Sequence, residues 1–489
     1  MAMRKFPLTD TDSLGQFSMV SPDGEIQTEV VTGTLRLVDT EVTLEVSPEI
    51  TPMMEYHKAP NGMIIGQPRA SEPAGFTVIG SLAMTPRLVS LWGTDIVRTT
   101  RVDFAAPGEL ASGNQEMRVR WCLTGDALRD PGMLFDTAYL DITNLHDWTA
   151  NSYFTRTISN SHNGMPQTWT LDFPERESIA LRDGGELSLS AHARTSAPSI
   201  GGFDAQTNTK AKIVLQPGAP LETIMTEFAT PLESLMTILS GKRSPIRGVQ
   251  LRKGEETAVD AYGIGVDASA PQSSGELLLR KGDVEQSLLV NWLGEADLLS
   301  PVPQILASVW AGSIPTAETE SLTLATTTEA LHELLYPKEE RFTAEEIQES
   351  KTAIEAAEMP PKIKQSLTGA LNNYRYGKPY KQRVEVLAEP VAKAVPSCIG
   401  DLSKWRNAVV DARHRLAHGA TGAIGEPEEF FRLVALTRSL RWMLTFRLLL
   451  HCGVSAEELG AAAARSDRYR KDRRKWEHFW TKIYATETE

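Results

Sequence analysis

The chain has 489 residues, of which 41% are hydrophobic and 23% charged, and its formal net charge is −13. This length and composition are sufficient for two to four packed domains and exclude wholesale disorder. The most apolar stretch, 430–450, contains four arginines, so we predict no membrane span. No apolar segment follows Met1, so we predict no secretory signal. The three cysteines form no CxxC pair, which argues against a disulfide scaffold or a zinc ribbon and favours the cytoplasm.

The first three hundred residues have the pattern of many short strands joined by turns. Residues 33–38 and 41–46 alternate with period two around a short turn, which predicts a hairpin. Similar runs recur at 76–82, 87–92, 116–123, 138–142, 186–190 and 211–215. One amphipathic helix is predicted over 221–239, with further strands to about Trp292. We expect an antiparallel, sandwich-like β-rich domain over residues 1–300.

The pattern becomes helical after 301–303, a proline-rich segment that reads as a linker. Thr343 with Glu346, and Ser455 with Glu458, have the spacing of capping boxes, in which a hydroxyl and a carboxylate bond the first free amides of a helix. Long helices are predicted over about 402–416 and 427–451, among six or so in total. We therefore expect an all-α bundle over residues 304–489. Residues 1–302 carry a balance of −14 and residues 303–489 one of +1, so the acidity does not exclude an anionic ligand on the helical half.

The densest group of reactive side chains lies at the end of the helix predicted over 402–416. Arg413, His414 and His418 fall within six positions, and the two histidines are spaced i, i+4, so they share a helix face. The partial negative charge of a helix C-terminus raises the pKa of a nearby imidazole. An imidazole that moves a proton, beside a guanidinium that binds phosphate, suits phosphodiester cleavage. Motifs of phosphate-binding loops, serine hydrolases and zinc proteases do not occur.

Two simpler interpretations of this helix end stay open from residue types alone. An Arg/His-rich C-terminus is electrostatically favourable by itself and can be only a solvated surface. His414 and His418 could bind a metal, although no third or fourth ligand is evident nearby, and we predict no metal and no cofactor.

Arg413-His414 followed by His418 at a helix end resembles the R-x(4–6)-H signature of HEPN-superfamily ribonucleases. His414 stands where that superfamily more often has asparagine. The wider chain is similar to ApeA-type antiphage HEPN proteins, in motifs that begin at Gly33, Val78, Phe135, Arg383 and Val410.

The resemblance implies a metal-independent endoribonuclease that acts in abortive antiphage defence as a toxin, with tRNA as one candidate target. In this scheme the RNA 2′-hydroxyl attacks the phosphate, which leaves a 2′,3′-cyclic phosphate and a 5′-hydroxyl. His418 acts as general base or acid, Arg413 steadies the phosphate oxygens, and His414 orients or relays. The resemblance also implies a homodimer or higher oligomer with a composite site, and a β-rich domain that restrains the nuclease until a phage-derived trigger appears.

A basic run near the C-terminus is a candidate RNA contact. Six cations surround two aromatic residues there, and such side chains neutralise phosphates and stack on bases: Arg468, Arg470, Lys471, Arg473, Arg474 and Lys475. The same run could be only a solvated helix face. An alternative function for the whole chain is a ligand-binding β domain with a non-catalytic helical dimerisation bundle.

Overall fold

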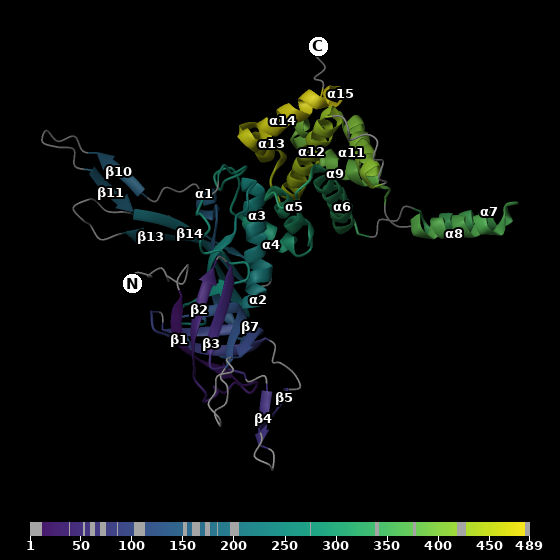
Figure 1. Ribbon diagram of the computed structural model, residues 1–489. Helices are drawn as coiled ribbons and strands as arrows, with labels where there is room; N and C mark the ends of the chain where they lie inside the picture. Colours follow the sequence, from purple (N-terminus) through teal and green to yellow (C-terminus); the bar gives the residue numbers. More distant parts are fainter. Residues whose placement is uncertain are drawn as a thin grey trace. The chain divides into compact units, whose positions relative to one another are not determined.

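The computed structural model describes residues 12–38, 40–51, 54–58, 64–68, 75–85, 87–101, 113–149, 154–158, 167–171, 177–182, 184–195, 205–273, 275–337, 342–374, 378–417 and 427–484. The chain divides into two compact units (Figure 1). The first comprises Met1–Met236 and Ser244–Ser274, and the second comprises Thr237–Arg243 and Gly275–Glu489.

The first unit is built on a twelve-stranded sheet in the order β12-β13-β14-β9-β15-β16-β8-β3-β2-β1-β6-β7, with two separate hairpins, β4-β5 and β10-β11. All strand pairings within the sheet are antiparallel. The strands are β1 Ser13–Val20, β2 Val31–Val38, β3 Glu41–Ser47, β4 Met54–Lys58, β5 Ile64–Pro68, β6 Phe76–Leu82, β7 Leu88–Arg101, β8 Gly113–Thr124, β9 Phe135–Ile142, β10 Phe154–Ile158, β11 Gln167–Leu171, β12 Ser178–Ala180, β13 Gly185–Thr195, β14 Ala205–Ala219, β15 Ile246–Arg252 and β16 Val259–Gly263.

Strand β8 closes part of this sheet on itself. One edge of β8 pairs with β7 along its length, from Gly113 to Thr124. The other edge pairs first with β3 and then with β16. Six strands, β8-β3-β2-β1-β6-β7, therefore form a closed sheet, and the rest of the large sheet continues from the second half of β8.

The inside of the closed sheet is a hydrophobic core. Alternate residues of β2 and β3 point into it, and Phe17, Leu35, Leu44 and Met117 are fully buried there. As the period-two alternation predicts, each of these strands has one buried apolar face and one solvated face. The predicted hairpin is confirmed as β2-β3, with Leu35 opposite Leu44.

Four short helical segments lie between strands along the chain, one after β9 and three after β14. They are α1 Leu145–Thr149, α2 Leu221–Ile224, the π-helical turn η1 Met225–Ala229 and α3 Thr230–Ser240. The last three form one continuous run, which matches the helix predicted over 221–239. The strands predicted to continue to Trp292 are wrong beyond β16, since Ser287–Ala296 forms the helix α4. Five of its residues are buried, and a short apolar run of this kind does not by itself distinguish a strand from a buried helix.

The second unit is helical, as predicted. Its helices from α4 onward are α4 Ser287–Ala296, α5 Val302–Trp310, α6 Ala317–Leu335, α7 Ala344–Ala356, α8 Pro361–Tyr374, α9 Tyr380–Ala394, α10 Pro396–Ile399, α11 Leu402–Ala417, α12 Pro427–His451, α13 Ala456–Arg465, α14 Asp467–Phe479 and α15 Thr481–Tyr484. None of the described helices of the chain is long and apolar enough to cross a membrane.

The predicted helix starts are confirmed where their capping residues were identified. Thr343 and Ser455 each form a complete capping box with the glutamate three residues later. The expected linker at 301–303 is instead the start of α5, with Pro303 in its first turn. A proline is tolerated there because the first amides of a helix have no intrahelical partner.

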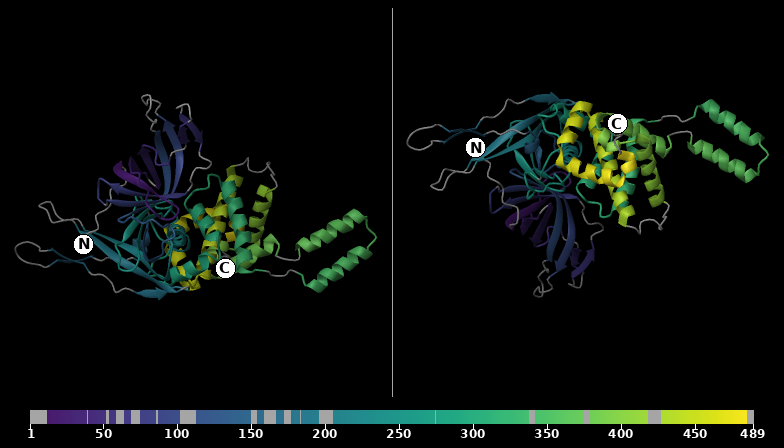
Figure 2. Two further views of the ribbon diagram at one scale, coloured as in Figure 1. Left: turned by 90° about the horizontal axis from the view of Figure 1, so that it is seen from below. Right: turned by 90° about the horizontal axis from the view of Figure 1, so that it is seen from above.

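Four helices, α6, α9, α11 and α12, pack against one another at the centre of this unit (Figures 1 and 2). α12 is buried on several sides, and its Trp442 and Phe446 are fully enclosed. The indole of Trp405 on α11 donates to Ser439 Oγ on α12 at 2.8 Å. This contact fixes the helix that carries the predicted R-x(4–6)-H motif against the centre of the bundle.

Candidate active site

Helix α11 begins at a well-defined cap. Gly400 has a φ of +62°, and Asp401 follows it with a carboxylate that accepts the Lys404 backbone N–H at 3.0 Å. That hydrogen bond holds the pKa of Asp401 below its usual range. From this start, Trp405, Val409 and Ala412 repeat on the buried face of the helix. The register of the helix then brings residue 413 to the rim of that buried face.

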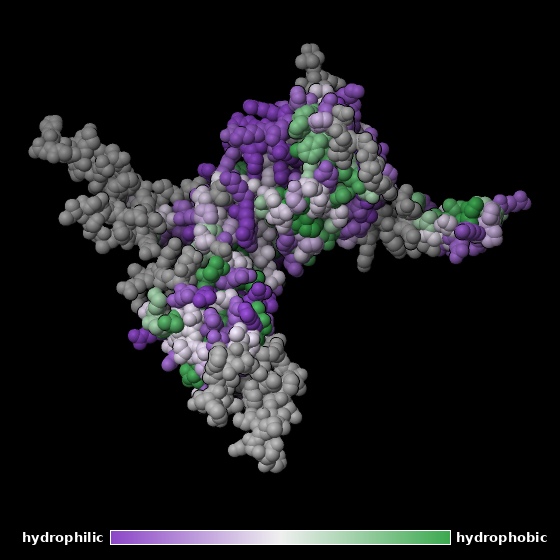
Figure 3. Space-filling model, viewed as in Figure 1, coloured by the Kyte–Doolittle hydropathy of each residue, from purple (hydrophilic) through white to green (hydrophobic). Residues whose placement is uncertain are grey.

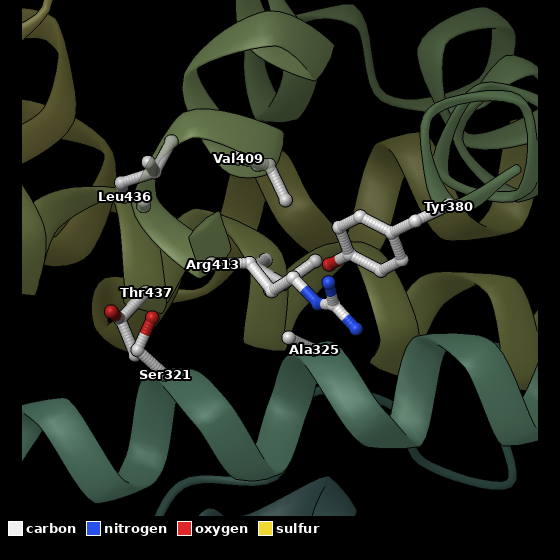
Figure 4. Close-up of a pocket in the computed structure, with 9 residues that line it drawn as sticks. Ser321, Ala325, Tyr380, Val409, Arg413, Leu436 and Thr437 are labelled. Carbon is white, nitrogen blue, oxygen red and sulfur yellow. The ribbon is translucent and has the colours of Figure 1, made fainter. Parts of the chain in front are cut away.

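Arg413 lies between three helices. Its Nη2 donates to Glu329 Oε1 on α6 at 2.9 Å, and its guanidinium carbon lies 5.1 Å from the centre of the Tyr380 ring on α9. Figure 4 shows the guanidinium extended past Val409 toward Tyr380, above helix α6. The Arg413 and Glu329 side chains are 37% and 34% exposed, so the pair is reachable from solvent. A carboxylate and an aromatic ring thus fix the orientation of the guanidinium. Within the described chain, Glu329 accepts a hydrogen bond from one of the five N–H donors of Arg413.

The electrostatics around Tyr380 keep its phenol neutral. Burial raises the pKa of the Tyr380 hydroxyl far above its usual range, and the nearby Glu329 carboxylate raises it further. Arg413 and Thr328 act in the opposite direction with smaller effects. Tyr380 is therefore a neutral face against which the arginine is oriented, and it is not a base at ordinary pH.

His414 lies on a different side of α11 from Arg413. It is exposed and lines a surface groove of about 710 Å³, while Arg413 lines the small pocket between α6, α9 and α12. The groove is lined by residues of α11, α12 and α15 together with Trp480: Lys404, Asn407, Ala408, Asp411, His414, Arg415, Glu429, Arg432, Trp480, Lys482 and Ile483. Within one chain, the two neighbouring motif residues are therefore not brought together.

His418 belongs to residues 418–426, which lie outside the described residues. The chain is described again from Pro427, where α12 begins. Arg415 Nη1 and Glu429 Oε2, 3.4 Å apart, join the end of α11 to the start of α12.

The predicted basic run forms α14, and Arg468 does not share the environment of the other five cations. Its guanidinium lies 4.3 Å from the Trp310 ring centre and 5.0 Å from that of Trp442, and its Nη2 donates to the carbonyl of Leu239 at 3.0 Å. Burial, followed by the repulsion of Arg441, lowers the pKa of Arg468 to about 10. Arg468 thus caps the end of α3 and is not an exposed RNA contact.

A glycine makes this approach possible. Gly241, directly after α3, has a φ of +66°, and a Cβ there would overlap the guanidinium of Arg468, with only 1.5 Å to Nη1. Any other side chain would displace the arginine from the carbonyls it caps.

The other five cations of the run are exposed on α14. Arg470 pairs with Asp467, and Arg473 Nε pairs with Glu477 Oε1 at 2.6 Å. The remaining three form no ion pair within the described part of the chain: Lys471, Arg474 and Lys475. These three give one face of α14 a positive charge that is not engaged in ion pairs within the described residues.

Sequence reasoning missed Glu329 and Tyr380, the two residues that orient Arg413. Glu329 is 84 positions upstream in a helix with several other glutamates, and no local pattern distinguishes it. Among the described residues, no three His, Cys, Asp or Glu side chains are grouped closely enough to bind a metal ion.

Comparison with known proteins identifies the helical part of the chain. The chain matches no curated protein and no solved structure. Residues 322–458 match the family model described as Apea-like HEPN. This match spans the helices from α6 through α12, and thus Arg413 with both side chains that orient it. The C-terminal region of this protein, residues 322–458, belongs to the Apea-like HEPN family.

Proposed function

We propose that the helical unit is a metal-independent endoribonuclease and that Arg413 and His418 carry its chemistry. The observation that carries the proposal is the fixed orientation of Arg413 by Glu329 and Tyr380 inside the region that matches the HEPN family. A solvated helix end would not require a carboxylate and a ring from two other helices. A phosphate-binding arginine benefits from such partners, because a guanidinium that is already oriented stabilises the charge developing on the phosphate without reorganisation of the site.

The reaction follows from the donors available. The 2′-oxygen of the RNA attacks the adjacent phosphorus while His418 takes the 2′-hydroxyl proton. The P–O5′ bond breaks, and a protonated imidazole supplies the proton that the leaving 5′-oxygen needs. Arg413 binds the non-bridging oxygens through the N–H donors that Glu329 does not use. The products are a 2′,3′-cyclic phosphate and a 5′-hydroxyl.

The proposal extends to assembly and biological role. Base and acid come from His418 residues of two copies, so the active form is a homodimer or higher homo-oligomer. His414, on the groove, orients or relays, and the exposed cations of α14 contact RNA. The β-rich N-terminal domain restrains this activity in the cytoplasm until a phage-derived trigger appears. Cleavage, with tRNA as one target, then aborts infection.

The test uses purified full-length protein with end-labelled RNA and a DNA strand of the same sequence in EDTA. We expect RNA cleavage to persist with cyclic-phosphate ends and the DNA to stay intact. Loss of activity in chelator with recovery on adding a divalent ion would refute the mechanism. RNA binding or ligand binding without any cleavage, in wild type and His418→Ala alike, would favour the alternative of a binding protein with a non-catalytic bundle.

A further inference from the structure

Helices α7 and α8 form a hairpin that buries almost nothing. They contain 13 and 14 residues and are joined by four residues, 357–360. Of residues 342–371, only Ile347 is buried. In the views of Figures 1 and 2 the two helices lie along each other, and no other described element lies beside them. Isolated helices of this length are marginal in water, so the pair needs a further packing partner.

An apolar stripe on α8 is left uncovered by α7. Ile363 and Leu367 are 48% and 41% exposed, and at a spacing of four residues they share one face of the helix. Figure 3 shows hydrophobic side chains gathered on this hairpin. Large apolar residues grouped on one helix face are typical of a surface that packs against another protein.

The two helices also carry opposite charge. α7 has four glutamates and one lysine, whereas α8 has two lysines and no acidic residue. A hairpin with one acidic and one basic helix is complementary to a second copy of itself. When two such hairpins pack with their α8 stripes together about a two-fold axis, each acidic helix lies next to the basic helix of the other copy.

We propose that the α7–α8 hairpin is a dimerisation arm that packs against the same hairpin of a second copy of this chain in an antiparallel four-helix bundle. The stripe that begins with Ile363 and Leu367 forms the centre of that bundle. RNA is a poorer occupant, because the four glutamates of α7 would repel phosphates. The proposal does not depend on the ribonuclease chemistry, because it concerns only how two chains are held.

The first test measures the mass of the full chain by light scattering across a dilution series. The variant is Ile363→Asp/Leu367→Asp, and its matched control is Gln365→Asp/Gly369→Asp, which adds the same charges at the same spacing on another exposed face. We expect the wild type and the control to be dimeric and the first variant to dissociate at least about 100-fold more readily. A monomeric wild type, or a first variant as dimeric as the control, would overturn the proposal.

A second test does not depend on whether the first variant folds. One chain carries Glu349→Lys/Glu355→Lys on α7, and another carries Lys362→Glu/Lys364→Glu on α8. Each alone places like charges across the proposed interface, but a mixture restores opposite charges at both contacts. We expect each chain to dimerise weakly and the mixture to form heterodimers in native mass spectrometry. Random mixing, or dimers unaffected by either pair of changes, would contradict the arrangement.

Discussion

Replacing Arg413 by alanine should separate folding from catalysis. The Arg413–Glu329 pair is about one-third exposed on both sides, so solvent screening limits its contribution to about 0.2–1 kcal/mol. The ring contact with Tyr380 adds about 0.5–1 kcal/mol. The total loss of unfolding free energy is then at most about 2 kcal/mol, or a melting shift of no more than about 8 °C for a unit of this size.

The effect on cleavage should be much larger than the effect on stability. Removing one oriented electrostatic stabiliser costs about 10²–10³ in rate. The assay is single-turnover cleavage of labelled RNA in EDTA, with saturating protein so that binding does not limit the rate. Thermal unfolding of the same sample reports whether the variant is folded.

Arg406→Ala is the matched control for this prediction. Arg406 lies seven residues earlier on the same face of α11 and pairs with Glu385 on α9 at 2.5 Å, so its loss removes an ion pair that is more buried than that of Arg413. We expect its cleavage rate to stay within about threefold of wild type, whatever its stability. If Arg413→Ala cleaved as fast as Arg406→Ala while folded, Arg413 would be an ordinary structural arginine, and our assignment of the active site would be refuted.

Three further predictions concern the rest of the helical unit. His414→Asn should keep cleavage within about tenfold of wild type, because asparagine still hydrogen-bonds from the groove; a loss as large as that of Arg413→Ala would show that the imidazole itself transfers a proton. Asp472→Asn should lower the free energy of unfolding, measured with denaturant, by about 3–5 kcal/mol, because this nearly buried carboxylate pairs with two arginines. Its control is Glu477→Gln on the surface of the same helix, which should lower it by less than about 1 kcal/mol. Equal losses would contradict the buried network. The third prediction concerns the α14 cations that form no ion pair within the described residues: Lys471, Arg474 and Lys475. Replacing them by glutamine should weaken RNA binding and lower the slope of log affinity against log salt concentration by about 0.7 per lost contact, measured by fluorescence anisotropy. An unchanged slope would show that α14 is not part of the RNA-binding surface.

The strands were predictable from sequence, but the way the sheet closes was not. Alternation in β2 and β3 shows which face is apolar, yet stacked sheets and a closed sheet produce the same pattern. Strand β8 decides between these two arrangements, because one of its edges pairs with two strands in succession. The first is Val42–Val46 of β3, and the second is β16, more than two hundred residues after β3 in the chain. Pairing at that sequence distance has no local signal.

Prediction of the candidate site had a similar limit. A helix end with Arg413 could be located because its caps and apolar repeat are local. Its partner Glu329 could not be located from the sequence. The packing role of Arg468 could not be predicted either, because in the sequence it is indistinguishable from its basic neighbours. Only the fold distinguishes a cation that faces solvent from one that lies against Trp310.

The helical unit is assembled from two separated stretches of the chain, and this has a consequence for modularity. Residues 237–243 supply the carbonyls that Arg468 caps, and α4 supplies Asn291, whose Nδ2 donates to the Cys452 carbonyl at 3.1 Å. A recombination event with a single crossover near residue 300 would deliver a bundle without either contact. A C-terminal cassette cut at that point would be less stable than the intact unit, and we expect the two halves of this protein to be inherited together.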